Sequence, residues 1–212
     1  VRILLAGMNH RSAPVEVRER FAVGDPGPIL EKLKACEEID EAVLISTCNR
    51  VEIVVTTRRL EAAHLRLRHF FQSELDRGGA SSIHLEGHLY EHRDRDAMAH
   101  VFRVAASIDS MVVGEPQILG QMKQAYRAAL EQGSCGPILS RLFQRAFATA
   151  KRVKNETRIA ERPVSVARVA VDLARQIFED LSDKTALMIG AGDMIEMALF
   201  ALQRDGLGAR RI

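Results

Sequence analysis

Two β-like runs joined by a short polar turn constrain this chain more than any other feature of its sequence. An apolar run over residues 42–45 leads into Ser46-Thr47-Cys48-Asn49-Arg50, and a β-branched run over residues 51–57 follows. β-branched residues favour strands, whereas Ser, Thr and Asn favour tight turns. The stretch therefore predicts a β-hairpin with Cys48 at its tip.

A cysteine at a hairpin tip has two interpretations. Its thiol would be exposed, and turn amides together with the guanidinium of Arg50 would stabilise the thiolate, which is the species that attacks carbon electrophiles. Alternatively, Cys48 is an ordinary small residue in a chain that also holds Cys36 and Cys135. Position alone favours the second interpretation.

The first ninety residues alternate between β-like and helical patterns. Residues 2–8, 42–45, 51–57 and 89–92 are β-like, whereas residues 28–38 and 60–75 carry apolar side chains at helical spacing. With a helical turn within residues 15–23, the order is strand, helix, strand, strand, helix, strand. That order is typical of a ferredoxin-like split βαβ unit, so residues 1–92 are predicted to form an α+β subdomain.

From Asp94 onward the pattern becomes helical. Gly114 and Pro116 interrupt it between residues 109 and 117, because both disfavour an unbroken helix. Helices are predicted to resume over residues 118–131 and 138–157, which gives a helical subdomain over residues 93–160. A further helix, capped by Ser165, is predicted to have its inner face at Val169, Leu173, Ile177 and Phe178.

The tail, residues 161–212, begins a third pattern. Residues 185–189 are typical of a buried strand, Gly190-Ala191-Gly192 follows directly, and a helix is predicted to end near Arg204 before a second strand. This is the opening β-α-β of an incomplete Rossmann-type domain, in which glycines let backbone amides approach a pyrophosphate. The third glycine of GxGxxG would fall at Ile195, so an ordinary strand-to-helix turn is the alternative.

Composition and cysteine usage exclude several classes of protein. No stretch approaches eighteen uninterrupted apolar residues, and the opening residues 1–7 are too short for a signal peptide, so we expect a cytoplasmic protein without a membrane segment. The three cysteines lack CxxC spacing, which argues against a disulfide scaffold and a zinc site. The histidines lack ligand-like pairing, so no metal is expected.

The net charge of +2 does not by itself indicate a nucleic-acid binder. Basic residues nevertheless cluster between positions 141 and 162, where only Glu156 and Glu161 oppose them. The seven are Arg141, Arg145, Lys151, Arg152, Lys154, Arg158 and Arg162. They would form a local phosphate-attracting face, or else a solvated helix surface.

Four stretches resemble glutamyl-tRNA reductase in order and spacing. They are Gly7-Met8-Asn9-His10-Arg11-Ser12-Ala13-Pro14-Val15-Glu16, Ser46-Thr47-Cys48-Asn49-Arg50-Val51-Glu52, residues 110–121 (SMVVGEPQILGQ) and residues 150–157 (AKRVKNET). Gly190-Ala191-Gly192 falls where that family has its NADPH domain. Val51 stands where a threonine is common, and most of the NADPH domain and the whole C-terminal dimerisation region are absent, so a fragment is expected.

The resemblance implies NADPH-dependent reduction of glutamyl-tRNA to glutamate-1-semialdehyde through a cysteine thioester, the first step of five-carbon tetrapyrrole (porphyrin, heme) biosynthesis. Residues 1–160 would be the catalytic, glutamyl-tRNA-binding domain, and residues 161–212 the truncated start of the NADPH-binding domain. Implied partners are glutamate-charged tRNA, glutamate-1-semialdehyde aminomutase and a second copy in a homodimer. The fragment is predicted to be acylated, to bind NADPH poorly and to yield no aldehyde.

The resemblance also assigns roles to single residues. Cys48 would be the nucleophile and His100 its acid/base partner, with a buried structural histidine as the alternative. Arg50 would clamp the substrate carboxylate, unless it is a turn arginine in solvent; Glu52 would bind the ammonium or orient Arg50, unless it is a solvated strand carboxylate. The other implied substrate-binding residues are Thr47, Asn49, Ser110, Glu115, Gln117 and Gln121. The implied cofactor-binding residues are Gly190, Ala191, Gly192, Asp193 and Met194.

Two rival interpretations belong to other classes. In the first, the chain is a non-catalytic tRNA- or partner-binding module, the basic helix acts, and Cys48 is incidental. In the second, it is an ordinary NAD(P)-dependent dehydrogenase. The second depends on residues 190–192 alone and leaves the first ninety residues unexplained.

Overall fold

The computed structural model describes residues 1–21, 23–77, 85–160, 166–178, 181, 184–190 and 193–204. Four strands form one sheet: β1 (Arg2–Asn9), β2 (Glu41–Ser46), β3 (Arg50–Thr57) and β4 (Tyr90–Arg93). The helices of the first half are α1 (Val15–Arg18), α2 (Gly27–Lys34) and α3 (Leu60–Arg77), with a 3-10 turn at Glu19–Phe21. Those that follow are α4 (Asp94–Ala105), α5 (Gln117–Glu131), α6 (Pro137–Glu156), a 3-10 turn at Arg158–Ala160, α7 (Val166–Phe178) and α8 (Asp193–Arg204).

The sheet has the strand order β2-β3-β1-β4, with every neighbouring pair antiparallel. Helices separate β1 from β2 and β3 from β4, so the predicted order of strand, helix, strand, strand, helix, strand is present and the predicted α+β class is confirmed. Strands β2 and β3 pair from Glu41 opposite Thr56 to Ser46 opposite Val51. That register leaves residues 47–49 as the hairpin turn.

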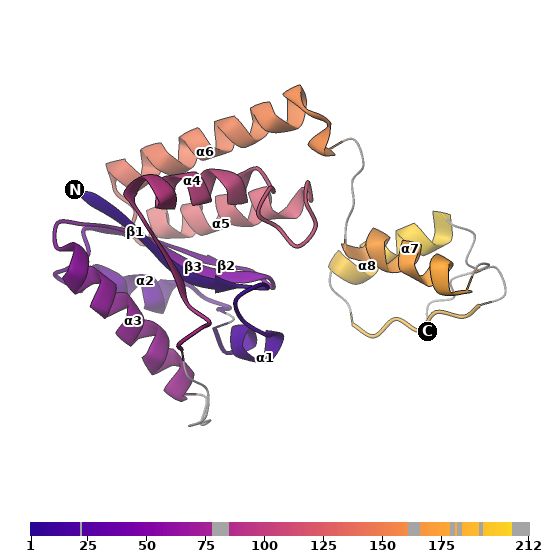
Figure 1. Cartoon of the computed structure of the whole chain (residues 1–212), viewed down its shortest axis with the longest axis horizontal. Helices are drawn as coiled ribbons and strands as arrows, with labels where there is room; N and C mark the ends of the chain where they lie inside the picture. Colours follow the sequence, from indigo (N-terminus) through magenta and orange to yellow (C-terminus); the bar gives the residue numbers. More distant parts are fainter. Residues whose placement is uncertain are drawn as a thin grey trace.

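Helices cover both faces of the sheet. Figure 1 shows α2 and α3 on one face and α4, α5 and α6 on the other, in agreement with their packing against the strands. As a result β3 is buried along its whole length and β1 along all but its first residue. A strand covered on both faces carries apolar side chains in near-continuous runs, as residues 2–8 and 51–57 do. Any charged side chain on these strands must therefore find its partners inside the protein.

Helices α7 and α8 pack against each other and lie apart from the sheet in Figure 1. Both helices confirm the pattern read from the sequence, but the predicted inner face of α7 is wrong. Its four residues, Val169, Leu173, Ile177 and Phe178, are exposed. Val171 instead packs with Leu181 and Leu202, because α8 lies against the opposite side of α7.

The predicted strand over residues 185–189 is also wrong. These residues are not in a strand, and Leu187 and Ile189 are 69% and 84% exposed. A buried strand requires neighbours that complete its backbone hydrogen bonds, and none of the described strands pairs with this segment. The second predicted strand, at 209–212, lies outside the described residues. Across the described part of the chain no helix is long and apolar enough to cross a membrane.

Candidate active site

The turn that carries Cys48 is built by the side chain of Thr47. The backbone N–H of Thr47 donates to the carbonyl of Arg50 over 2.9 Å, and the Thr47 hydroxyl accepts from the amides of Asn49 and Arg50 over 3.2 and 3.1 Å. This arrangement leaves Cys48 exposed at the tip, as predicted. Because the amides of Asn49 and Arg50 donate to the Thr47 hydroxyl, these two turn amides are not free to stabilise a thiolate at Cys48.

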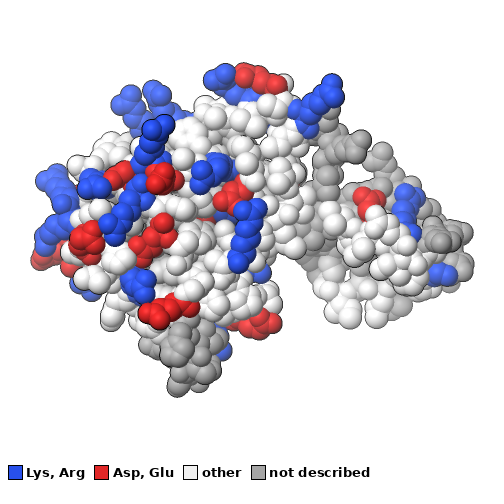
Figure 2. All heavy atoms as spheres, viewed as in Figure 1, with Lys and Arg blue, Asp and Glu red and all other residues white. Residues whose placement is uncertain are grey.

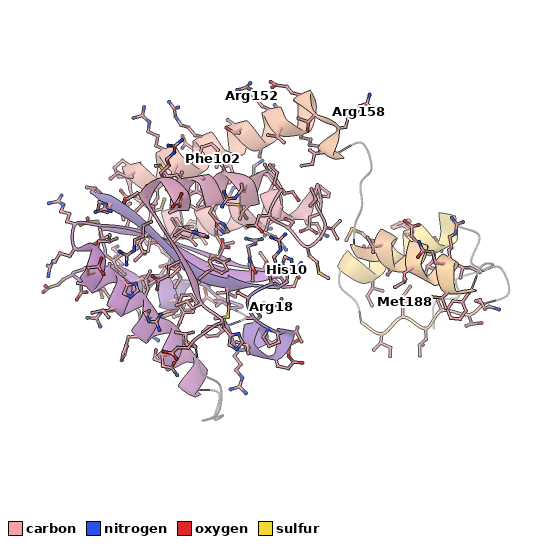
Figure 3. The ribbon with its side chains drawn as sticks, in the orientation of Figure 1. His10, Arg18, Phe102, Arg152, Arg158 and Met188 are labelled. Atoms are coloured by element: carbon pink, nitrogen blue, oxygen red, sulfur yellow. The ribbon has the colours of Figure 1, made fainter. Side chains whose placement is uncertain are left out.

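Two further residues hold the turn from outside the hairpin. The guanidinium of Arg18, on α1, donates through Nη1 to the carbonyl of Cys48 and through Nε to the carbonyl of Ala13 over 3.2 Å. The amide of His10 donates to the carbonyl of Asn49 over 3.0 Å. Figure 3 shows His10 and Arg18 at the end of the sheet that faces α7 and α8. A fixed cation thus lies against the backbone of the cysteine.

Behind the turn, a fully buried carboxylate gathers three donors. Oε1 of Glu52 accepts hydrogen bonds from Nη1 of Arg50 and Nε2 of His100, both at 2.8 Å, and from the hydroxyl of Tyr90. Arg50 and His100 are also buried, and the His92 ring stacks on His100 at 4.7 Å between centroids. The solvated alternatives for Arg50 and Glu52 are therefore wrong, because helices cover the sheet face on which both side chains lie.

Asp109 links this cluster to the loop between α4 and α5. Its carbonyl accepts from Nη2 of Arg50, and its carboxylate lies 3.4 Å from Nδ1 of His100 and 3.6 Å from Arg11. Neither Oδ1 of Asp109 nor Nδ1 of His100 takes part in a hydrogen bond. Among the described residues, Oε2 of Glu52, Oδ1 of Asp109 and Nδ1 of His100 are thus buried polar atoms without a hydrogen bond. Such atoms are the ones that a polar ligand would satisfy.

The surroundings set the charges in the cluster. Burial alone would raise the pKa of Glu52, but the hydrogen bond from His100, the charge of Arg50 and the Tyr90 hydroxyl together lower that pKa to about 2. Burial and the neighbouring Glu52 raise the pKa of Tyr90, so its hydroxyl stays a donor. Burial lowers the pKa of His10, and the cations of Arg11 and Arg50 lower it further. Glu52 is therefore a carboxylate at neutral pH.

The sheet leaves room for this cluster at Gly7. The register pairs Gly7 with Glu52 on β3 and with Tyr90 on β4. A Cβ atom at Gly7 would lie 2.5 Å from the carbonyl oxygen of Val51 and 2.7 Å from Cγ of Glu52. Because Gly7 has no side chain, those of Glu52 and Tyr90 can meet across the central strand.

Substitution of Gly7 by alanine is expected to lower the free energy of unfolding by about 2 kcal/mol, because backbone and a buried side chain must move to admit the methyl group. The matched control is Gly120→Ala. Gly120 lies inside α5 with open space around it, so the same methyl group is expected to stabilise the chain by about 1 kcal/mol. Urea unfolding measures both changes, and equal midpoints for the two variants would contradict this account of Gly7.

The remaining predicted substrate residues lie on or after the loop that carries Asp109. Ser110 is buried and its hydroxyl lies 3.3 Å from that of Ser107, and Glu115 is buried with a pKa raised by burial, partly offset by Arg50. Gln117 begins α5, and its side-chain amide lies 3.6 Å from the sulfur of Met197 on α8. Gln121 is partly buried one turn further along α5. The structure thus pairs Ser110 with Ser107, places Glu115 within reach of the Arg50 charge and turns Gln117 toward α8.

Three of the five predicted cofactor-binding residues lie in the described part of the chain. Gly190 has a φ of +130°, which glycine adopts readily, and Asp193 and Met194 begin α8. Ala191 and Gly192 lie outside the described residues. Since residues 185–189 are not a strand, the described part of this region does not fit a pyrophosphate cradle between a strand and a helix. Among the described residues no cluster of His, Cys, Asp or Glu is suited to a metal ion.

Sequence reasoning missed Arg18, Tyr90 and Asp109. Arg18 lies four residues beyond the Pro14 of the first motif, and Asp109 directly precedes the third motif, so a longer reading of both motifs would have included them. Tyr90 carries no such signal, because it joins Glu52 only through the pairing of β4 with β1.

The fold and the site together define a class: an α+β domain with a four-stranded antiparallel sheet, an exposed thiol at a hairpin turn and a buried cluster of acid, base and guanidinium groups on the strand that follows. Residues 6–157 match the family described as Glutamyl-tRNAGlu reductase, N-terminal domain. The chain therefore belongs to the glutamyl-tRNA reductase family.

Individual relatives agree with this assignment. The chain is 46% identical to glutamyl-tRNA reductase of Syntrophotalea carbinolica over 98% of its own length and 47% of that protein. It is 50% identical to the Geobacter metallireducens protein over 93% and 45%. The solved glutamyl-tRNA reductase from Methanopyrus kandleri matches with a TM-score of 0.66 and 32% identity, covering 99% of this chain and 49% of that one. The chain thus spans about half the length of its relatives.

Proposed function

We propose that this chain performs the acyl-transfer half of glutamyl-tRNA reduction. The thiolate of Cys48 attacks the ester carbonyl carbon of glutamyl-tRNA and forms a carbon–sulfur bond. The bond from that carbon to the ribose oxygen of the tRNA breaks, and the oxygen leaves with a proton as the free hydroxyl. The product is a glutamyl thioester on Cys48.

The observation that supports this proposal is an exposed thiol on the turn that leads directly into Arg50 and Glu52, whose buried cluster holds polar atoms without a hydrogen bond. A glutamyl group carries an ammonium and a carboxylate, which require an anionic and a cationic partner. Glu52 and Asp109 each offer a buried carboxylate oxygen without a hydrogen bond for the ammonium. Arg50 offers the cation, and a substrate carboxylate would replace its contact with the Asp109 carbonyl.

His100 is better suited to positioning Glu52 than to touching the thiol. Its Nε2–H donates to Glu52, and no hydrogen bond joins its ring to Cys48 in the described structure. The acid/base role that the resemblance implies for His100 stays a prediction. The division into a catalytic domain over residues 1–160 and the start of an NADPH-binding domain over residues 161–212 is likewise part of the proposal.

The whole protein is proposed to continue to glutamate-1-semialdehyde, the first step of tetrapyrrole biosynthesis, with NADPH supplying the hydride when bound. Its proposed partners are glutamate-charged tRNA, glutamate-1-semialdehyde aminomutase and a second copy of itself. No hydride-transfer step follows from the described residues of this chain, because they do not form the pyrophosphate cradle.

Glutamyl-tRNA labelled in its glutamate tests the acyl transfer. We expect the 212-residue chain to acquire label that is released by hydroxylamine, which cleaves thioesters, and to yield no aldehyde when NADPH is added. The same tRNA charged with alanine is the control, because alanine lacks the side-chain carboxylate that Arg50 would bind. A chain that binds the tRNA yet acquires no label would favour the non-catalytic binding module.

A further inference from the structure

Helix α6 exposes cations at both of its ends. Arg141 and Arg145 lie toward the N-terminal end of the helix, and Lys151 and Lys154 lie toward its C-terminal end. All four side chains are exposed. None of the four is in an ion pair within the described structure, whereas Arg152 is paired with Glu156 over 3.0 Å. Figure 2 shows blue spheres along the edge of the molecule that α6 occupies.

The two ends of α6 lie at opposite ends of the sheet. The start of α6 is fixed by Glu41, the first residue of β2, whose carboxylate accepts from the amides of Ile138 and Leu139 over 3.1 and 2.7 Å. Cys48 follows the last residue of β2, at the other end of the strand. Figure 1 shows α6 above α4 and α5, with its C-terminal end on the side of the molecule that faces α7 and α8 and the loop between α4 and α5 between it and the sheet.

A series of contacts connects the hairpin turn with the C-terminal end of α6. Arg50 joins the hairpin to the loop at Asp109, and at Gly114 the same loop meets the 3-10 turn that follows α6. A Cβ atom at Gly114 would lie 2.2 Å from the carbonyl oxygen of Ile159, so the two backbones meet there. Lys154 and Glu115 line one hollow beside that contact; Glu115 is buried, so Lys154 is the charge that a ligand meets.

We propose that Lys151 and Lys154 bind the phosphate backbone of the tRNA acceptor strand, an inference that rests on the proposed function. When the 3′ ribose of the tRNA is esterified to the group at Cys48, the phosphates that precede it must leave the site past neighbouring protein surface. The C-terminal end of α6 carries Lys151 and Lys154, two cations without an ion-pair partner in the described structure, on that surface. Along the helix axis Arg145 lies about 9 Å and Arg141 about 15 Å from Lys151, so with a Debye length of about 10 Å at 0.1 M salt Arg141 is the better separated of the two from the lysine pair.

Salt-dependent binding of uncharged tRNA to the 212-residue chain tests this inference. Replacing both Lys151 and Lys154 by alanine is expected to weaken binding about tenfold at 50 mM salt. It is also expected to reduce the slope of log K against log salt concentration by about 1.5, because two phosphate contacts are lost. The matched control is Arg141→Ala with Arg145→Ala, which removes the same charge from the other end of α6 and is expected to leave both quantities unchanged.

The outcomes distinguish tRNA binding at Lys151 and Lys154 from acyl transfer to Cys48. Equal losses in the two double variants, or no loss in either, would overturn the inference, since binding would then depend on overall charge or on another surface. Label transfer from glutamyl-tRNA is measured on the same preparations. If the wild-type chain binds tRNA through this lysine pair but acquires no label, the inference holds and the proposed function fails.

Discussion

Replacement of Cys48 by serine abolishes the transfer of label from glutamyl-tRNA to this chain, as the largest single effect that we expect. A serine hydroxyl keeps the size and the polarity of the exposed turn residue, but it is a far weaker nucleophile at neutral pH than a thiol. The backbone contacts from Thr47 and Arg18 do not involve the sulfur, so the turn is expected to keep its conformation. The loss would therefore report chemistry and not folding.

The chain offers its own controls for this experiment. Cys36 is partly buried with its sulfur 3.2 Å from the carbonyl of Lys32, and Cys135 is buried with its sulfur 3.5 Å from the hydroxyl of Ser140, so a serine hydroxyl has a polar group close by at either position. Cys36→Ser and Cys135→Ser are expected to acquire label like the wild-type chain. Transfer to the Cys48→Ser variant at the wild-type rate and stoichiometry would show that another residue carries the acyl group.

Local patterns were sufficient to predict most of the elements. The apolar runs at residues 2–8 and 51–57 and the helical spacing in residues 60–75 became β1, β3 and α3, because strand and helix periods can be recognised within a few residues. The exposed position of Cys48 also followed from local turn chemistry. These predictions required no knowledge of the neighbouring elements.

Predictions that depend on neighbours were less successful. Glu52 was expected in solvent as one alternative, but α4, α5 and α6 cover its face of the sheet. Residues 185–189 have the composition of a buried strand, yet they find no strand to pair with among the described residues. The site itself joins Glu52 to Tyr90 across 38 residues and Arg50 to Asp109 across 59 residues, which a local pattern cannot specify.

Glu52 is expected to dominate the stability of the site. Replacing it by glutamine removes the nearer of the two carboxylates paired with the buried guanidinium of Arg50, since Glu52 lies at 2.8 Å and Asp109 at 3.9 Å, and loss of one partner of a buried ion pair costs about 3–5 kcal/mol. The control is Glu156→Gln, which breaks the exposed pair with Arg152 and is expected to leave the unfolding midpoint nearly unchanged. Urea unfolding at pH 7 compares the two variants.

The pH dependence of stability distinguishes a charge effect of Glu52 from an effect of its shape. The pKa of Glu52 is about 2 in the folded chain and 4.5 in its ordinary state, so the folded state binds fewer protons between these values. Its contribution, about 3 kcal/mol, is therefore fully present above pH 4.5 and is lost as the pH falls toward 2. The difference in unfolding free energy between wild type and Glu52→Gln should accordingly be large at pH 7 and shrink from pH 4.5 to pH 3. A difference that stays constant over this range would mean that Glu52 stabilises the site through its shape and not through its charge.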